Sequence, residues 1–392
     1  MKRKVCVFTG TRAEYGLLKP LMSELKRDKN VKLQTLVSGM HLSKDFGLTY
    51  KEILKDGFKI DAKVDIDLKS DTPEGISRST GLGTMRYAKT FARLKPDLVV
   101  VLGDRFEAFA AATAAMIARI PIAHLYGGEA TYGLIDEPIR HSITKMSHLH
   151  FASLEEYRNR IIQLGESPQK VFKVGAIGLD NIRQLKLLTK KELERDLGVK
   201  FLKRNLLVTF HPVTLEREAS GQQIKNLLAA LQECKDTFII FTKGNADTDG
   251  RIINKMIDQY VKKYPNTSKA FVSLGQMRYL SCVKAVDAVV GNSSSGIVEV
   301  PSFKIPTVNI GRRQAGRVQA ASVINCAPRK KDISRALRKA FSEDFRKKLK
   351  TVKNPYGDGK STNRISKILK DCSLDNILMK SFYDMKGKNG EK

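Results

Sequence analysis

Residues 97–110 read DLVVVLGDRFEAFA, an apolar run that ends at Gly103 and Asp104 and leads into a helical pattern. An unbroken run of Leu and Val predicts a strand that is buried on both faces, as in a parallel sheet. A strand that passes through a glycine turn into a helix is the first half of a βαβ unit. This stretch therefore predicts an α/β fold and places an aspartate just beyond the carboxyl end of a strand.

The same alternation of strand and helix patterns recurs along the chain. Its strand candidates are KVCVFTG, VKLQTLVSG, IPIAHLYGG, LHFAS and KVFKVGA, and then, beyond a lysine-rich stretch near 184–204, NLLVTFHP, TFIIFTKG, AFVSLG, DAVVGNSS and IPTVNIG. We predict two Rossmann-like domains, residues 1–183 and 184–360, and a C-terminal helix and tail, residues 361–392, that cross back to the first domain. Ligands of such folds bind where the parallel strands end, so we expect an active cleft between the domains.

Composition limits the class of protein. A chain of 392 residues with 42% hydrophobic residues can fill two cores, at ~150 residues per domain. No apolar run reaches the ~18 residues of a membrane span, and the basic start MKRKVCVFTG does not resemble a signal peptide. Five scattered cysteines without a CxxC pair predict reduced thiols in a cytoplasmic protein, with no disulfide framework and no metal site.

The net charge of +29 raises the possibility of nucleic-acid binding. Many of the lysines, however, lie in stretches such as TKKELERDLGVKFLKR, where apolar residues recur at helical spacing and the lysines fit solvated faces. Aromatic residues make up only 7% of the chain and Trp is absent, so few side chains could stack on single-stranded bases. We favour a generally basic surface that also attracts anionic small substrates, and keep nucleic-acid binding as an alternative.

The first predicted strand ends in a glycine turn, FTGTRAEYG, that contains Gly10 and Arg12. A glycine turn that leads into a helix can offer backbone N–H groups to an anion, and Arg12 adds a fixed positive charge. Many α/β proteins begin with such a turn for structural reasons alone, so both interpretations stand.

Three carboxylates follow neighbouring strands of the first domain. Asp104 could be only a helix N-cap, and Asp136 has the spacing of an ordinary intrahelical pair with Arg140. Glu129 follows two glycines in the loop that leads to Asp136. Because these strands end at one edge of the sheet, three acids there indicate a cleft in which protons are transferred.

In the second domain, His211 directly follows a strand and is the histidine that we expect to be functional. We interpret His124, His148 and His150 as core residues. The stretch 291–313, GNSSSGIVEVPSFKIPTVNIGRR, offers hydroxyls and backbone N–H groups to a phosphate, a glutamate to ribose hydroxyls and arginines to a diphosphate. The residues that we expect to bind a nucleoside diphosphate here are Ser294, Ser295, Gly296, Glu299, Arg312, Arg313 and Arg317.

These motifs also resemble a known family. The segments GTRAEYGLL, GMHLSKDFGLT, LGDRFEAFAAATAA, GGEATYGLIDEPIRHSITKMSHLHF, TFHPVT, GNSSSGIVEVPSFKIPTVNIGRRQAGR and NPYGDGKS are similar to those of the hydrolysing UDP-N-acetylglucosamine 2-epimerases of sialic-acid and legionaminic-acid synthesis. The resemblance covers nearly the whole chain. It implies a glycosyltransferase-B-like pair of Rossmann domains and a nucleotide-sugar substrate, with no cofactor, nucleic acid or membrane, and we expect a homo-oligomer, either a dimer or a tetramer.

By the same resemblance, Asp104, Glu129 and Asp136 take the acid–base positions, with His211 near the sugar and phosphates. Arg12 would lie near the diphosphate, and the nucleotide would be held by Ser294, Ser295, Glu299 and Arg317. The non-hydrolysing relatives carry a histidine where this chain reads FTKGNAD and a glutamine-rich effector motif where it reads GMHLSKDFG. Both departures favour the hydrolysing branch.

The implied reaction eliminates the nucleoside diphosphate to give a 2-acetamidoglucal, which water and a proton then convert to the free 2-epimer. Such a route needs carboxyl groups in different protonation states and positive charge at the leaving diphosphate. A glycosyltransferase of the same fold would bind the same substrate but would need an acceptor. Whether the base is uracil or guanine, and which 2-acetamido sugar it carries, stays open.

Overall fold

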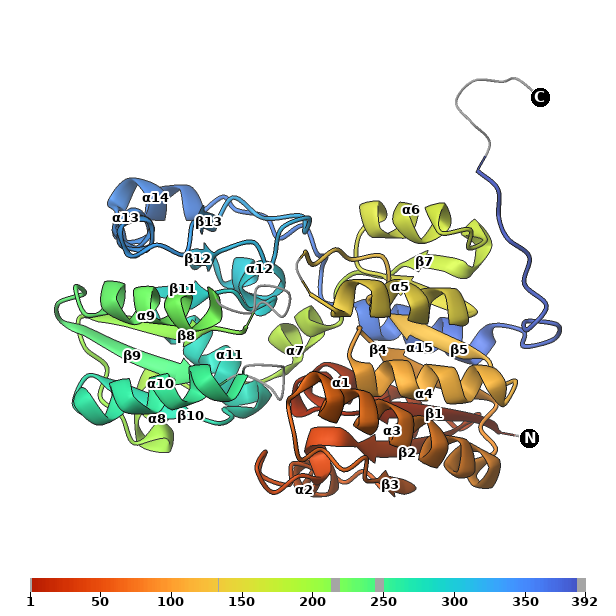
Figure 1. Cartoon of the computed structure of the whole chain (residues 1–392). Coiled ribbons are helices and arrows are strands. Elements are labelled where there is room, and N and C mark those ends of the chain that lie inside the picture. The colour runs from red at the N-terminus through yellow and green to blue at the C-terminus, as the bar shows by residue number, and fades with distance from the viewer. Residues whose placement is uncertain (1, 133, 213–218, 244–249, 386–392) are drawn as a thin grey trace. The chain divides into compact units, whose positions relative to one another are not determined.

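The computed structural model describes residues 2–132, 134–212, 219–243 and 250–385. The chain forms two compact units (Figure 1). The first comprises Met1–Glu129, Asp136–Asp180 and Tyr356–Lys392, and the second comprises Ala130–Ile135 and Asn181–Pro355. Each unit is built on a parallel sheet with helices between its strands, so the predicted α/β class is confirmed.

The sheet of the first unit has the strand order β3-β2-β1-β4-β5-β6-β7, with every neighbouring pair parallel. The strand order turns outward in both directions from β1 and β4, as in a doubly wound fold. The strands are β1 (Arg3–Thr9), β2 (Val31–Ser38), β3 (Ala62–Val64), β4 (Leu98–Leu102), β5 (Ile122–Leu125), β6 (Leu149–Ala152) and β7 (Val171–Lys173).

Strand β4 shows why an unbroken apolar run occupies the middle of this sheet. Leu98, Val100 and Leu102 pack into one hydrophobic cluster, whereas Val99 and Val101 pack into another. Successive side chains of a strand point to opposite faces, so the two clusters lie on the two faces of the sheet. The sequence prediction of a strand buried on both faces is therefore confirmed.

Helices follow the strands of this unit. They are α1 (Arg12–Arg27), α2 (Tyr50–Lys55), α3 (Pro73–Leu94), α4 (Phe106–Ile117), α5 (Asp136–Met146), α6 (Glu155–Gln163) and α15 (Ser361–Asp371), with 3-10 turns η1 (Gly39–Leu42) and η2 (Pro168–Lys170). Helix α7 (Gly178–Gln184) contains the change from the first unit to the second at Asp180.

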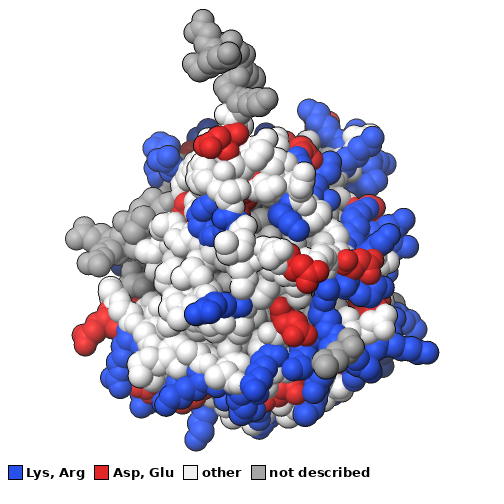
Figure 2. Space-filling model, turned by 90° about the vertical axis from the view of Figure 1, so that its right-hand side faces the viewer, with Lys and Arg blue, Asp and Glu red and all other residues white. Residues whose placement is uncertain are grey.

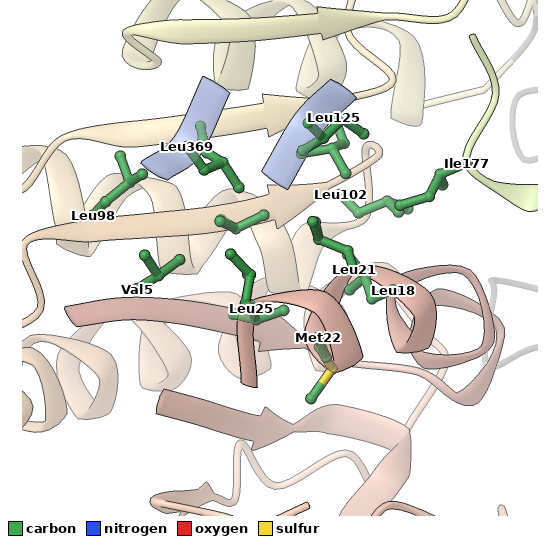
Figure 3. Close-up of a cluster of buried hydrophobic side chains, with 14 of the residues drawn as sticks. Val5, Leu18, Leu21, Met22, Leu25, Leu98, Leu102, Leu125, Ile177 and Leu369 are labelled. Carbon is green, nitrogen blue, oxygen red and sulfur yellow. The ribbon is translucent and has the colours of Figure 1, made fainter. Parts of the chain in front are cut away.

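Helix α15 completes the first unit although it comes from the end of the chain. Figure 3 shows Leu369 of α15 in the same cluster as Leu18, Leu21 and Leu25 of α1 and Val5 of β1. The buried carboxylate of Asp180 accepts hydrogen bonds from the backbone N–H groups of Ser361 and Thr362, which begin α15. An acceptor at a helix N-terminus satisfies otherwise unpaired N–H groups.

The sheet of the second unit has the strand order β10-β9-β8-β11-β12-β13 and is also parallel. Its strands are β8 (Arg204–Thr209), β9 (Thr237–Thr242), β10 (Ser268–Phe271), β11 (Ala288–Gly291), β12 (Thr307–Ile310) and β13 (Val323–Cys326). Its helices are α8 (Lys190–Leu197), α9 (Ala219–Leu231), α10 (Gly250–Lys263), α11 (Gly275–Ala285), α12 (Ser295–Val298), α13 (Lys330–Phe341) and α14 (Glu343–Leu349), and η3 (Val300–Phe303) is a 3-10 turn.

The sequence pattern missed the edge strands β3 and β13, and it placed β10 about two residues too late, at AFVSLG. In the described part of the chain, every helix is too short or too polar to span a lipid bilayer.

Candidate active site

Each sheet has a carboxyl edge, by which we mean the edge at which its parallel strands end. In the first unit, Gly103 and Asp104 follow β4, Glu129 follows β5, and Ser153 follows β6. Gly103 has a φ of +77°, a conformation that glycine adopts readily, and it turns the chain sharply after the strand. This turn places the Asp104 carboxylate at the carboxyl edge.

Arg140 of α5 joins these loops. Its side chain is 1% exposed and forms ion pairs with Asp104 and, at 2.5 Å, with Glu137. The same guanidinium donates a hydrogen bond of 2.9 Å to the backbone carbonyl of Glu129. Burial alone would lower the pKa of the Arg140 guanidinium, but the carboxylates of Asp104, Glu137 and Glu129 raise it. We call Arg140, Asp104, Glu137 and Glu129 the carboxylate cluster.

The predicted acids occupy different places relative to this cluster. Asp104 and Glu129 belong to it, and Asp136 is the half-buried first residue of α5. Glu137, which was not among the predicted catalytic residues, contacts both Arg140 and His141, with 3.3 Å between a Glu137 carboxylate oxygen and the His141 Nε2. The sequence did contain a signal for Glu137, because Glu137 and Arg140 have the i,i+3 spacing of a helical ion pair.

Two buried side chains hold the loops of the carboxylate cluster. The Ser153 hydroxyl donates a hydrogen bond of 3.2 Å to the Glu129 carboxylate, which is only 3% exposed. His124 of β5 lies 2.7 Å from the carbonyl oxygen of Gly103 through its Nε2 and 3.2 Å from the Thr144 hydroxyl of α5 through its Nδ1. Burial lowers the pKa of His124 to about 3, so this imidazole is neutral at physiological pH and donates through Nε2 to the carbonyl.

In the glycine turn after β1, the backbone N–H groups that could bind an anion are already bonded to a side chain of the protein. The N–H groups of Gly10 and Thr11 donate to the Glu14 carboxylate at 2.7 and 3.2 Å. Burial, and secondarily the charge of Glu107, raise the pKa of Glu14 to about 8. An external anion would have to compete with Glu14 for these N–H groups. Arg12, the first residue of α1, is half-buried, and its pKa is lowered mainly by burial.

The motif GMHLSKDFGLT supports this turn. His41 is fully buried, and its Nε2 lies 3.0 Å from the Thr9 hydroxyl, next to the turn, while its Nδ1 lies 2.8 Å from the Thr49 hydroxyl. Burial lowers the pKa of His41 to about 3, which keeps the imidazole neutral. The motif thus joins the end of β1 to the segment that leads into α2.

At the carboxyl edge of the second unit, a neutral side chain connects the loops. The Asn292 Oδ1 accepts a hydrogen bond of 2.7 Å from the backbone N–H of His211, and its Nδ2 donates one of 2.8 Å to the backbone carbonyl of the same residue. The backbone carbonyl of Asn292 accepts from Arg313 Nη1 at 3.1 Å and from Gln314 Nε2 at 2.8 Å. The loops that follow β8, β11 and β12 are therefore joined at Asn292.

Close approach of β11 to β8 at this edge requires a glycine. Gly291 has a φ of +133°, and a Cβ on it would lie 1.8 Å from the Thr209 carbonyl oxygen. Gly296 is constrained in a similar way, because a Cβ there would lie 2.8 Å from the Thr307 Cγ2. Gly296 thus allows α12 to pack on β12, which is a structural reason for a residue that the sequence assigned to phosphate binding.

The remaining predicted nucleotide ligands surround α12 and follow β12. Ser294 is exposed and Ser295 is half-buried. Glu299 is 8% exposed and lies directly after α12, as its C-cap residue. The three predicted arginines all lie in the loop after β12: Arg312 is exposed, whereas Arg313 and Arg317 are half-buried.

Two parts of the predicted motifs fall outside the described residues, namely GNAD in FTKGNAD and Val213 and Thr214 in TFHPVT. Over the ranges that the structure describes, no three His, Cys, Asp or Glu side chains gather in an arrangement that could hold a metal ion.

The chain is similar to known proteins over almost its full length. A family model described as UDP-N-acetylglucosamine 2-epimerase matches residues 23–370. The chain is 45% identical over 385 residues to the GDP/UDP-N,N'-diacetylbacillosamine 2-epimerase (hydrolyzing) of Campylobacter jejuni, with 98% of this chain and 100% of that protein covered. It is 35% identical over 379 residues to the UDP-N,N'-diacetylbacillosamine 2-epimerase (hydrolyzing) of Legionella pneumophila, with 97% of this chain and 98% of that protein covered.

A solved structure shows the same fold. The UDP-GlcNAc 2-epimerase of Methanocaldococcus jannaschii, in complex with UDP-GlcNAc and UDP, matches with a TM-score of 0.77 and 23% sequence identity, covering 93% of this chain and 99% of that one. The predicted glycosyltransferase-B-like fold class is therefore confirmed.

Proposed function

The chain belongs to the UDP-N-acetylglucosamine 2-epimerase family, and from this premise we propose that it is a hydrolysing nucleotide-sugar 2-epimerase. It releases a nucleoside diphosphate and the free sugar inverted at C2. The observation that carries the proposal is the carboxylate cluster, in which Arg140 holds Asp104 and Glu137 by ion pairs and the Glu129 loop by a backbone hydrogen bond. Several carboxylates around one buried cation are suited to proton transfer at a weakly acidic carbon.

The first step of the proposed reaction is an elimination. A carboxylate removes the hydrogen from C2, the bond between C1 and the diphosphate oxygen breaks, and a 2-acetamidoglucal forms. In the second step a carboxyl group returns a proton to C2 from the opposite face, while water adds its hydroxyl to C1 and gives its remaining proton to a carboxylate. We assign these transfers to Asp104, Glu129 and Asp136, as the family resemblance implies, and add Glu137 because it shares Arg140 with Asp104.

The second unit supplies the nucleotide contacts in this proposal. Arg12 of the first unit and Arg312, Arg313 and Arg317 of the second stabilise the departing diphosphate, whose negative charge increases as the C1–O bond breaks. Glu299 accepts hydrogen bonds from the ribose hydroxyls. The contacts to the phosphates come from His211, Ser294, Ser295 and the backbone near Gly296.

For the sugar, we propose a 2,4-diacetamido-6-deoxy sugar of the N,N'-diacetylbacillosamine type rather than N-acetylglucosamine. The support is the identity of 45% and 35% to two relatives whose names specify this sugar. The free 2-epimer would then serve the synthesis of a sialic-acid-like sugar such as legionaminic acid. We place the enzyme in the cytoplasm, where its five free cysteines would stay reduced, and expect a homo-oligomer, which light scattering would measure.

The test is to incubate the protein with UDP- and GDP-linked diacetylbacillosamine and with UDP-N-acetylglucosamine, and to measure free nucleoside diphosphate and free sugar without any acceptor. In heavy water the product should carry deuterium at C2, and in oxygen-18 water it should carry the label at C1 while the nucleoside diphosphate stays unlabelled. Label in the diphosphate would indicate hydrolysis at phosphorus. Product that retains its original C2 hydrogen would exclude the elimination route, and a requirement for an acceptor would indicate a glycosyltransferase.

Nucleic-acid binding stays the alternative that the net charge of +29 raises, and Figure 2 shows how charge is distributed on one face. Lys and Arg side chains gather along the lower and right-hand margins of that face with acidic side chains among them, and a few also lie in the largely uncharged middle. Duplex binding is favoured by a continuous basic stripe. A filter-binding assay at two salt concentrations measures any residual affinity for nucleic acid.

A further inference from the structure

We propose that Asn292 is a positioning residue for the nucleoside diphosphate and that it acts through His211. The inference rests on the proposed function and extends it to a residue that the sequence did not single out. The Asn292 amide forms two hydrogen bonds to one residue, accepting from the His211 N–H and donating to the His211 carbonyl. We call this pair of bonds the amide bridge.

The amide bridge requires an amide in particular. A carboxylate could accept from the His211 N–H but would repel its carbonyl oxygen, and an apolar side chain would leave both backbone groups without this partner. Asn292 is 1% exposed and His211 is 9% exposed, so water has little access to replace either bond. Loss of one bond would therefore leave a buried polar group unsatisfied and shift the loop.

Asn292 fixes the position of more than one group of the proposed site. His211 follows β8, which pairs directly with β11, the strand that ends just before Asn292. The Asn292 carbonyl also accepts from Arg313 and Gln314 of the loop after β12. A single residue thus fixes the backbone of His211 and one nitrogen of Arg313, two groups that we assign to the phosphates. Groups held in place before the ligand arrives lose less entropy on binding.

The same sheet contains a matched control. Asn205, at the opposite end of β8, forms an identical pair of bonds to Leu202: its Oδ1 accepts from the Leu202 N–H at 2.9 Å and its Nδ2 donates to the Leu202 carbonyl at 3.0 Å. Asn205 is 2% exposed and is the second residue of β8, at the amino end of the strand, whereas His211 follows its carboxyl end. A change at Asn205 removes the same chemistry at the end of the strand that lies away from the proposed site.

The experiment compares Asn292→Asp with Asn205→Asp, each in the full-length protein. Thermal unfolding and the affinities for UDP and uridine are measured from pH 6 to pH 8.5, together with kcat and KM. At pH 8.5 both variants should lose similar stability, but only Asn292→Asp should bind UDP about tenfold or more weakly, with uridine affinity changed much less. At pH 6 a protonated aspartic acid can donate again, so Asn292→Asp should recover UDP affinity.

A double-mutant cycle separates positioning from general damage. If Asn292 acts through His211, the losses in UDP affinity of His211→Ala and Asn292→Asp should be clearly less than additive in the double variant. Equal losses in UDP affinity for Asn292→Asp and Asn205→Asp, or an equal loss for UDP and uridine, would overturn the inference while leaving the proposed function intact. A wild-type protein that neither binds UDP or GDP nor releases them from any sugar of the panel would instead overturn the proposed function, and this inference with it.

Discussion

The loops at the two carboxyl edges are joined by different chemistry, an ion pair network in the first unit and a neutral amide in the second. In the first unit, the buried guanidinium of Arg140 forms ion pairs with Asp104 and Glu137. In the second unit, the neutral amide of Asn292 forms the amide bridge to His211. Ion pairing keeps several carboxylates close together, as proton transfer requires. The amide bridge and the Asn292 carbonyl connect His211 and Arg313 without adding a negative charge beside the groups that we propose to bind the diphosphate.

The largest effect should follow from removing the cation of the first edge. Arg140→Met leaves the partly exposed carboxylates of Asp104 and Glu137 without their partner, so we expect the free energy of unfolding to fall by about 1.5–3 kcal/mol and turnover to fall by about 100-fold or more. UDP affinity should change by less than about threefold, because we propose that most of the nucleotide contacts, Arg12 apart, come from the second unit. Denaturant unfolding, steady-state kinetics and calorimetry measure the three quantities, with Arg140→Lys as the variant that keeps the charge. A loss of UDP affinity as large as the loss of turnover would contradict the division of roles.

Removing single proton-transfer groups should affect turnover without affecting the fold. Glu129→Gln and Asp104→Asn keep the size of the side chain, and each should lower kcat by about 100-fold while KM and the melting temperature change little. Glu155→Gln, at an exposed acid of α6, serves as the control and should leave kcat unchanged. Near-normal turnover in both variants would reduce these acids to structural residues of their loops.

A smaller effect is expected from the second edge. Glu299→Ala should weaken nucleoside diphosphate binding by about 1–3 kcal/mol, because the ribose hydroxyls lose a charged acceptor. The change should appear mainly in KM and in the affinity for UDP or GDP measured by calorimetry, with kcat at saturation nearly preserved. Glu343→Ala, at the exposed start of α14, is the matched control. Unchanged affinity in Glu299→Ala would remove this residue from the nucleotide site.

The last prediction concerns only the pH dependence of stability at the first edge, and no change in turnover or UDP affinity is assigned to it. The pKa of Glu14 is raised to about 8 by burial and by Glu107, whereas the ordinary value is 4.5. Between these values the folded protein holds a proton that the unfolded chain has released, so the contribution of Glu14 to stability is present below about pH 4.5 and is lost as the pH rises to about 8. Glu14→Gln cannot release a proton and should lack this decline. Melting temperatures at several pH values between 5 and 9 measure it, and parallel curves for the two proteins would show that Glu14 is already ionised.

The sequence predicted the fold class because strand and helix patterns alternate clearly. The central strands β1, β4 and β8 were found, since burial on both faces gives each of them an uninterrupted apolar run: Val5–Phe8, Leu98–Leu102 and Leu206–Val208. The edge strand β3 has only three residues and β13 only four, and each carries polar side chains. Their pairing depends on the neighbouring strand rather than on their own pattern.

The sequence could predict those residues of the candidate site that lie just beyond the ends of strands. Asp104, Glu129 and His211 each follow a strand, and that position alone singled them out. Helical spacing indicated an acidic partner for Arg140 but did not decide between Asp136 and Glu137, and the ion pair with Asp104 could not be predicted because Asp104 comes from another loop. The amide bridge of Asn292 was equally hidden, because it exists only once β8 and β11 pair.

Helix α15 has a consequence for the way the protein is made. Its Leu369 fills the core that surrounds Val5 and Leu18, which are synthesised long before it (Figure 3). The second unit, in contrast, draws its residues from Ala130–Ile135 and Asn181–Pro355, so all of them have been translated before α15 begins. On the ribosome, therefore, the second unit is the first to have all of its own residues, and the first unit waits with one side of its core open until the final helix emerges. Loss of the last helix would damage the unit that contains the N-terminus, and the nascent chain would be most exposed to chaperones and proteases during that interval.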